Sequence, residues 1–221
     1  MLESMYYYVD HTSRFGRNTG IQRCVRSIAA GLIGGGVPLH PVVWSREHGD
    51  LVPAAPEALQ HLARWSGPAP DAWAAQPAGQ WLLIVELVSG PHQPTAAQLQ
   101  QAARCRGLRL AWVFHDAIPL RLAQLYGARA ASAAAHHRAY MAGLALADVV
   151  LANSHTSAEQ LRAWLSEQGL PAGHVQALPL AAEYPGVPRC VEAEPTSSSG
   201  NRLLAVGSLE PRKNHGALLM A

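Results

Sequence analysis

The sequence predicts an α/β protein built on a doubly wound, Rossmann-like parallel sheet. Apolar runs with strand character alternate along the chain with segments of helical periodicity, a pattern typical of a parallel sheet with helices on both faces. Hydrophobic residues make up 49% of the 221 residues and charged residues 14%, which is the composition of a folded protein rather than a disordered one. We therefore expect a sizeable hydrophobic core.

Six apolar segments are the predicted strands: residues 5–9, 39–44, 81–88, 108–114, 148–151 and 175–180. Pro41 indicates that the second strand lies at an edge or starts irregularly, because proline donates no backbone hydrogen bond. Residues 10–19 have the composition of a polar loop. Residues 45–80 are rich in Pro, Ala and Trp without clear periodicity, and they predict a surface excursion with one helix near 57–65.

Apolar residues at helical spacing and capping signals mark the helices between these strands. Asn18 or Thr19 can cap a helix that the glycines at 34–36 end, and Thr95 can cap a second helix to residue 106. Residues 128–147 are rich in alanine, which favours a helix. Thr156 and Glu159 have the spacing of a capping box for a helix to about residue 168.

The chain divides into a predicted N-terminal domain at residues 1–191, a linker at 192–201 and the opening of a second α/β domain at 202–221. The linker reads EAEPTSSSGN, a composition typical of flexible connections. After it, residues 203–206 predict a buried strand, residues 207–214 a turn-rich loop, and His215 the start of a helix.

Composition excludes several classes of partner. A net charge of +2 is too small for a nucleic-acid interface. Cys24, Cys105 and Cys190 are far apart and lack metal-ligand spacing, so we interpret them as free thiols in a reducing compartment. The first residues do not have the layout of a signal peptide, and no apolar stretch is long enough to span a membrane. We expect a cytoplasmic protein.

Other familiar sites are also not indicated. The glycine triplet follows a helix rather than a strand, and the chain has no GxGxxG or Walker-type loop, which weighs against NAD and ATP chemistry. His136 and His137 are adjacent in a predicted helix and do not face one another, so they do not indicate a metal site. Glu86 lies in a strand and lacks a second carboxylate at the spacing of a paired-acid hydrolase.

Polar motifs follow three predicted strands: Thr19-Gly20 with Arg23, His115-Asp116, and Asn153-Ser154. In a doubly wound sheet, ligands bind beyond the carboxyl ends of the strands. We therefore expect these motifs to line one crevice, facing the loop of Arg212 and Lys213 across the linker. All but one of the 17 Lys and Arg residues are Arg, and Lys213 is the exception. The planar guanidinium of Arg212 and the compact ammonium of Lys213, in one loop, suit the oxygens of a diphosphate.

Three segments carry a resemblance to a known family. Residues 206–219, reading VGSLEPRKNHGALL, resemble the first strand, loop and helix of the C-terminal domain of family 4 GT-B glycosyltransferases, the large retaining family that includes many bacterial mannosyltransferases. Residues 19–23, reading TGIQR, and 114–120, reading FHDAIPL, agree with it. The segments occur in the family's order, and the resemblance covers nearly all of the chain.

The resemblance implies transfer of a hexose, with retention, from a nucleoside diphosphate sugar to a glycan or lipid-linked acceptor in bacterial surface polysaccharide synthesis. It suggests GDP-mannose as the donor, no metal or other cofactor, and peripheral contact with the inner face of the membrane as an option. It also implies the roles of the motif residues: His115 and Asp116 would be catalytic, Gly20, Arg212 and Lys213 would bind the donor phosphates, and Thr19, Arg23, Asn153 and Ser154 would bind substrate.

Each of these residues also has a plain structural interpretation. Gly20 can be a turn or cap residue, Arg23 and the Arg212-Lys213 pair can be solvated, and Asn153-Ser154 can cap a helix. His115 can bond a loop carbonyl, and Asp116 can hold the following turn through an Asx bond.

The same resemblance implies a second domain that extends well beyond the segment present here. We expect the 221 residues alone to be inactive, with the missing part of the C-terminal domain required for donor binding. Two alternatives remain open: a non-catalytic or degenerate sugar- or nucleotide-binding module, and a GT-B-type nucleotide-sugar epimerase.

Overall fold

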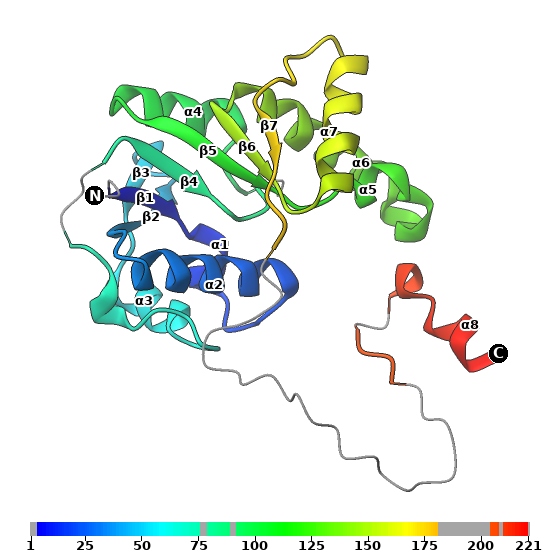
Figure 1. Cartoon of the computed structure of the whole chain (residues 1–221), viewed down its shortest axis with the longest axis horizontal. Coiled ribbons are helices and arrows are strands. Elements are labelled where there is room, and N and C mark those ends of the chain that lie inside the picture. The colour runs from blue at the N-terminus through cyan, green and yellow to red at the C-terminus, as the bar shows by residue number, and fades with distance from the viewer. Residues whose placement is uncertain (1–3, 76–78, 89–91, 181–203, 208–209, 221) are drawn as a thin grey trace, which may run out of the picture.

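The computed structural model describes residues 4–75, 79–88, 92–180, 204–207 and 210–220 (Figure 1). Within these residues the strands form a seven-stranded sheet in the order β3-β2-β1-β4-β5-β6-β7. Every neighbouring pair is parallel except β2 and β3, which are antiparallel. The strands are β1 (Met5–Tyr8), β2 (Leu39–Ser45), β3 (Asp50–Pro53), β4 (Trp81–Ile84), β5 (Arg109–Phe114), β6 (Val149–Ala152) and β7 (Val175–Ala177).

Helices connect the strands and cover both faces of the sheet (Figure 1). The α-helices are α1 (Asp10–Arg14), α2 (Gly20–Gly34), α3 (Pro56–Leu62), α4 (Ala96–Cys105), α5 (Ile118–Arg121), α6 (Ala130–Gly143), α7 (His155–Glu167) and α8 (His215–Met220). Short 3-10 helices lie at Pro70–Ala72, Ala123–Arg129, Leu144–Leu146 and Pro211–Lys213. The mainly parallel sheet between two helical layers confirms the predicted fold class.

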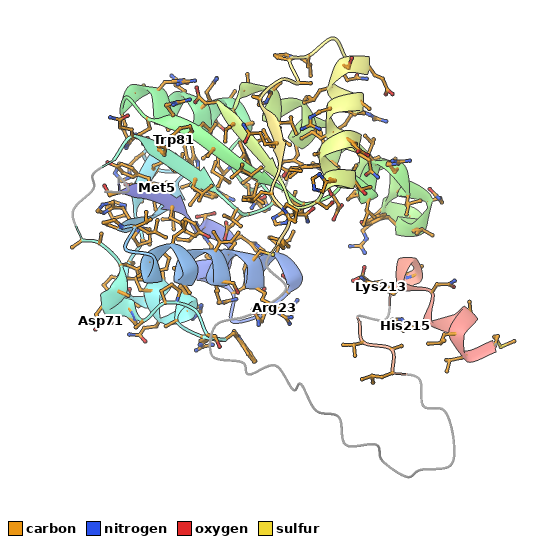
Figure 2. All side chains as sticks on the ribbon, viewed as in Figure 1. Met5, Arg23, Asp71, Trp81, Lys213 and His215 are labelled. Carbon is orange, nitrogen blue, oxygen red and sulfur yellow. The ribbon has the colours of Figure 1, made fainter. Side chains whose placement is uncertain are left out.

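Alternation of side chains along the strands divides the core into two layers. On one face, Tyr7 and Val85 pack with α2 and α3. On the other, Trp112 and Phe114 pack with α4, α6 and α7. The paired residues Met5 and Trp81 mark the amino ends of β1 and β4 at one end of the sheet, and Arg23 in the first turns of α2 lies at the other end (Figure 2).

Two predictions about the first strands were wrong. Residues 10–14 form α1 rather than a loop, because the buried Glu86 carboxylate accepts hydrogen bonds from the backbone N–H groups of His11 and Thr12 at the helix start. Pro41 does not mark an edge, because β2 lies between β1 and β3. Its carbonyl accepts the Ala54 N–H at 2.8 Å, so the proline still contributes an acceptor beside β3.

Three boundaries also differ from the prediction. Strand β3 lies in the stretch assigned to a surface excursion, whereas α3 lies where one helix near 57–65 was predicted. Helix α7 is capped by Ser154, whose Oγ accepts the Ser157 N–H at 3.0 Å, rather than by Thr156. Strands β4 and β7 end at Ile84 and Ala177, before the predicted ends at residues 88 and 180.

The predicted strand at 203–206 was wrong for the residues that the structure describes. Residues 204–206 are not in a strand, and Leu204 and Val206 are 88% and 86% exposed. A parallel strand needs a neighbour to pair with its backbone, and this segment pairs with none of the described strands. The loop and helix were predicted correctly, since α8 begins at His215.

Glycine in two helices provides a test of this packing. A Cβ at Gly143 would collide with the Ala96 Cβ, where α6 meets α4, whereas a Cβ at Gly31 in α2 would meet nothing within 4 Å. We expect Gly143→Ala to lower the free energy of unfolding by about 1–3 kcal/mol through overpacking. Gly31→Ala should raise it by about 0.5–1 kcal/mol, because alanine favours helix. Urea unfolding of both variants measures this, and a shift of the same sign in both would contradict the packing.

Candidate functional site

The candidate site lies where the direction of strand addition reverses. From β1 the chain adds β2 and β3 on one side, then returns to add β4 to β7 on the other. In doubly wound sheets this switch point leaves a crevice beyond the carboxyl ends of the two central strands. Here those ends lead into Asp10 and Val85, and the crevice lies between the loops that follow β1, β4 and β5.

His115 follows β5 directly and is only 7% exposed. Its Nε2 lies 2.7 Å from the Val85 carbonyl oxygen, so Nε2 carries the proton and donates it. Burial lowers the pKa of His115, opposed by this hydrogen bond and by Asp116. The imidazole is therefore neutral near pH 7, and Nδ1, which has no partner among the described residues, is left as a hydrogen-bond acceptor.

Asp116 is fixed by two local contacts. Its Oδ1 accepts the Ile118 N–H at 2.9 Å, which is the Asx bond that one interpretation of the sequence predicted. Its carbonyl oxygen accepts a hydrogen bond from Nε2 of His137 in α6, at 2.9 Å. The carboxylate therefore shapes the turn into α5 and still lines the pocket beside His115.

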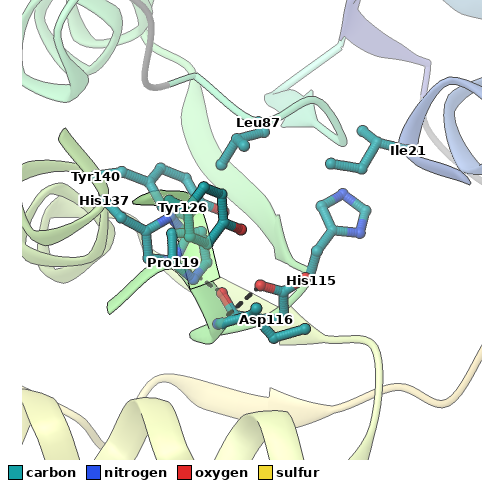
Figure 3. Close-up of a pocket in the computed structure, with 9 residues that line it drawn as sticks. Ile21, Leu87, His115, Asp116, Pro119, Tyr126, His137 and Tyr140 are labelled. Carbon is teal, nitrogen blue, oxygen red and sulfur yellow. Dashed lines mark hydrogen bonds between the residues drawn. The ribbon is translucent and has the colours of Figure 1, made fainter. Parts of the chain in front are cut away.

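A pocket of about 170 Å³ opens beside these two residues (Figure 3). Apolar side chains make up much of its wall, with His115, Asp116, His137 and two tyrosines as the polar members; the lining residues are Ile21, Leu87, His115, Asp116, Ile118, Pro119, Tyr126, His137 and Tyr140. An apolar wall with a few polar groups suits a small polar ligand whose orientation must be fixed.

The second motif reaches this pocket through Ile21, the neighbour of Gly20. Gly20 is the first residue of α2, and the Thr19 N–H donates to Oε1 of Gln22 at 3.0 Å, as in a capping box. A Cβ at Gly20 would meet nothing within 4 Å, so packing does not require glycine there. Arg23 is exposed one turn into the helix.

A buried arginine fixes the loop that leads into this helix. Arg26 in α2 is 1% exposed, and its guanidinium donates to the carbonyl of Arg17, to Oδ1 of Asn18 and to the carbonyl of His61. These bonds join the loop before Gly20 to the end of α3. Arg26 therefore positions the Thr19-Gly20 motif without reaching the pocket lining itself.

The third motif is joined to His115 through a serine. Ser157 Oγ lies 3.1 Å from the His115 carbonyl oxygen and 2.9 Å from Oδ1 of Asn153, with one proton for the two acceptors. Ser154 Oγ donates to Ser157 Oγ at 2.9 Å and also caps α7. The loop after β6 thus supports the loop after β5, but neither Asn153 nor Ser154 lines the pocket.

Glu86 occupies the centre of the switch point. It is 1% exposed, and its two oxygens accept the backbone N–H groups of His11 at 2.7 Å and Thr12 at 2.6 Å. Burial raises its pKa to about 7, opposed by these hydrogen bonds and assisted by the nearby charge of Asp10. The carboxylate joins the start of α1 to the end of β4.

The basic loop lies in a separate described segment. Lys213 is exposed, and its backbone N–H donates to the Glu210 carbonyl at 2.9 Å within the turn before α8. The predicted linker at 192–201 lies outside the described residues. The approach of Arg212 and Lys213 to the crevice therefore stays a prediction.

Comparison with known proteins leaves this geometry as the main guide to function. A scan against protein-family models and a search of curated proteins gave no match to this chain. In the part of the chain that the structure describes, no three His, Cys, Asp or Glu residues cluster as metal ligands. No helix there combines the length and hydrophobicity needed to cross a bilayer.

The sequence analysis singled out the motif residues but not the residues whose hydrogen bonds position the motif loops. Glu86 was noticed only as a strand carboxylate, and Arg26 and Ser157 were not singled out. A charged residue inside an otherwise apolar run such as residues 81–88 is the signal that could have identified Glu86, since buried charges need partners. Nothing in the local sequence indicates the contact of Ser157 with His115, which joins residues 42 positions apart.

The raised pKa of Glu86 predicts an unusual dependence of stability on pH. Its value in the unfolded chain is about 4.3 and in the folded protein about 7, so folding favours the protonated acid. The free energy of unfolding is therefore highest below about pH 4.3. It falls by about 4 kcal/mol in total as pH rises from there through 7.

The measurement compares wild type with Glu86→Gln, which cannot ionise, by urea unfolding from pH 4 to 8. Subtracting one curve from the other cancels the contributions of His115 and His137. Their lowered pKa values make the free energy of unfolding rise with pH, opposite to the effect of Glu86. The free energy of unfolding of wild type should fall relative to the variant across this range. A difference that stays constant with pH would show that folding does not shift the pKa of Glu86.

Proposed function

We propose that this protein is a retaining glycosyltransferase that moves a hexose from a nucleoside diphosphate sugar to a hydroxyl of a glycan or lipid-linked acceptor. GDP-mannose is the first donor to test. The observation that carries the proposal is the neutral, oriented imidazole of His115 beside Asp116 in the switch-point pocket, with the start of α2 on its rim. The motif resemblance of residues 19–23, 114–120 and 206–219 supports it.

The pocket residues suit recognition of a sugar. Nδ1 of His115 can accept a hydrogen bond from a sugar hydroxyl, because Nε2 is already committed to the Val85 carbonyl. Leu87, Ile118 and Pro119 supply apolar wall that can pack against a sugar ring and exclude water. Such a site would orient the hexose rather than supply charge.

Charge would come from elsewhere in the proposed reaction. The bond from C1 of the hexose to the acceptor oxygen forms, and the bond from C1 to the phosphate oxygen breaks. The acceptor proton passes to the departing nucleoside diphosphate. Arg212, Lys213 and the N–H groups at the start of α2 beside Gly20 would neutralise that diphosphate, which makes a bound metal unnecessary.

The test is an assay of the full-length gene product with a panel of nucleoside diphosphate sugars, with and without glycan and lipid-linked acceptors. Transfer requires release of nucleoside diphosphate that depends on an acceptor. Conversion of one nucleotide sugar into its epimer without acceptor would favour the epimerase instead. Binding of a nucleotide sugar with neither reaction would favour a non-catalytic module.

Two substitutions separate the chemical role of His115 from its structural one. Gln can keep an N–H at the position of Nε2 and so keep the bond to Val85, but it removes the acceptor Nδ1. We expect His115→Gln to fold with a near-normal melting temperature and to lose about 10²-fold or more in kcat. His115→Ala should lose both activity and stability, because the buried Val85 carbonyl loses its donor.

Kinetics in the full-length protein and thermal unfolding measure these effects. Near-normal kcat in His115→Gln would leave His115 a purely structural residue.

Lys213 offers a test of the proposed diphosphate contact. Replacement by Met should cost about 1.5–3 kcal/mol of transition-state stabilisation, roughly 10- to 150-fold in rate, with little change in stability because the side chain is exposed. Lys213→Arg keeps the charge but replaces a compact ammonium with a planar fork, so we expect a partial loss. Wild-type kinetics in both full-length variants would place Lys213 outside the donor site.

A further inference from the structure

Two large aromatic side chains, Phe15 and Trp65, are exposed in segments that touch one another. Phe15 directly follows α1 and is 47% exposed, and Trp65 lies just beyond α3 and is 59% exposed. The Trp65 Nε1–H donates to the Gly16 carbonyl oxygen at 3.3 Å. Residues 14–17 and 64–66 are all exposed, so this contact joins them into one stretch of surface, which we call the aromatic-basic patch.

Trp65 has a backbone conformation that a bulky residue rarely adopts. The φ angles of Trp65 and Ser66 are 58° and 64°, in the left-handed region, where a residue other than glycine is strained. The turn is closed by the Gly67 N–H, which donates to the Arg64 carbonyl at 3.1 Å. Because more than half of Trp65 is exposed, packing among the described residues does not explain a tryptophan at this position. A partner that covers the exposed ring would account for it.

The surface around the two rings is basic. Neither residues 11–34 nor residues 58–70 contain Asp or Glu, and together they hold five arginines. The exposed ones are Arg14, Arg17, Arg23 and Arg64. The Arg64 guanidinium lies within the patch, because a Cβ built on Gly16 would be 2.7 Å from its Nη1. Asp10 pairs with Arg14 alone, so the patch keeps an excess of positive charge.

Exposed aromatic rings beside arginines suit the surface of an anionic bilayer. Aromatic side chains favour the headgroup level of a membrane, and basic side chains are attracted to anionic headgroups. The N–H of Trp65 is already bonded to Gly16, so the ring can enter the headgroup region without leaving a donor unpaired. The whole chain carries a net charge of only +2, so attraction to anions is local to surfaces such as this one.

We propose that the aromatic-basic patch docks this protein on the surface of a bilayer that contains anionic phospholipids. Phe15 and Trp65 would enter the headgroup region, and the exposed arginines would contact the lipid phosphates. Arg26 joins residues 17 and 18 to the end of α3, so the patch adjoins the loop that leads into α2, and docking would bring the switch-point pocket close to the lipid surface. Docking involves no chemical step, so its test is independent of the proposed glycosyl transfer.

The experiment is co-sedimentation of the 221-residue chain with vesicles of two compositions. One is pure phosphatidylcholine, and the other contains about 30% phosphatidylglycerol. We expect the chain to bind the anionic vesicles at least roughly tenfold more tightly than the neutral ones at low salt, and to lose most of this preference at about 0.5 M NaCl because salt screens the arginines.

Variants then assign the binding to the patch. Trp65→Gly removes the ring and suits the left-handed backbone, so we expect a near-normal melting temperature and roughly tenfold weaker binding to anionic vesicles. Trp65→Phe keeps a ring and should keep most of the binding, whereas Phe15→Ser should weaken it. Arg17→Glu should weaken binding to anionic vesicles, and Arg138→Glu, which makes the same change of charge at an exposed position of α6, should not.

Three results would overturn the proposal: equal binding to the two kinds of vesicle, full binding in Trp65→Gly, or an equal loss in the two Arg→Glu variants. Heparin provides a polyanion without a bilayer. Binding to heparin that is as tight as binding to vesicles, and that Trp65→Gly leaves unchanged, would make the patch a general polyanion site instead. If a variant fails to fold, the wild-type comparison of the two vesicle compositions decides on its own.

Discussion

The contact on which the site depends is made at the end of β4, by two consecutive residues. The Val85 carbonyl accepts the His115 Nε2 proton, and the Glu86 carboxylate accepts the N–H groups that begin α1. One short stretch therefore holds the loop after β5 through its backbone and the helix after β1 through a side chain. Because β1 and β4 are the two central strands of the switch point, a change there moves both walls of the crevice at once. Glu86 fits this role because it has two acceptor oxygens, one for each N–H, although burial makes its ionised form costly.

The protonation of His115 constrains what the crevice can do. An imidazole whose Nε2 proton bonds a carbonyl, and whose pKa is lowered by burial, is a neutral acceptor at Nδ1. It suits a hydroxyl group and contributes no positive charge to a phosphate. A reaction that releases a diphosphate would therefore need positive charge from a source other than His115, and arginines and Lys213 are the strongly basic residues of this chain. In the proposed transferase, the neutral imidazole of His115 would orient the sugar and a charged loop would receive the leaving group.

The local sequence was sufficient to predict a helix or strand where neighbouring residues determine it. Thr95 caps α4 through bonds with Gln98, three residues away, and the apolar runs gave the strands of the parallel sheet. His115 and Asp116 were correctly placed after a strand, because the end of an apolar run marks the end of a strand. Prediction failed where a distant residue decides. Helix α1 is capped by Glu86, 75 positions from His11, and β3 is fixed by pairing with β2. The strand expected at 203–206 has the right composition, but composition cannot supply a pairing neighbour.

Two glycines show how the structure separates packing from a possible contact with ligand. Gly143 lies against Ala96, so its missing side chain is explained by the fold. Gly20 has open space where a Cβ would stand, so packing does not explain the glycine there. Open space alone does not indicate a ligand, because Gly31 has it too. The difference is position: Gly20 is at the first turn of α2, next to Ile21 on the pocket wall, where backbone N–H groups have no helical partner. A ligand that bonds those N–H groups must come close to the backbone at Gly20, and a methyl group there would stand in its way.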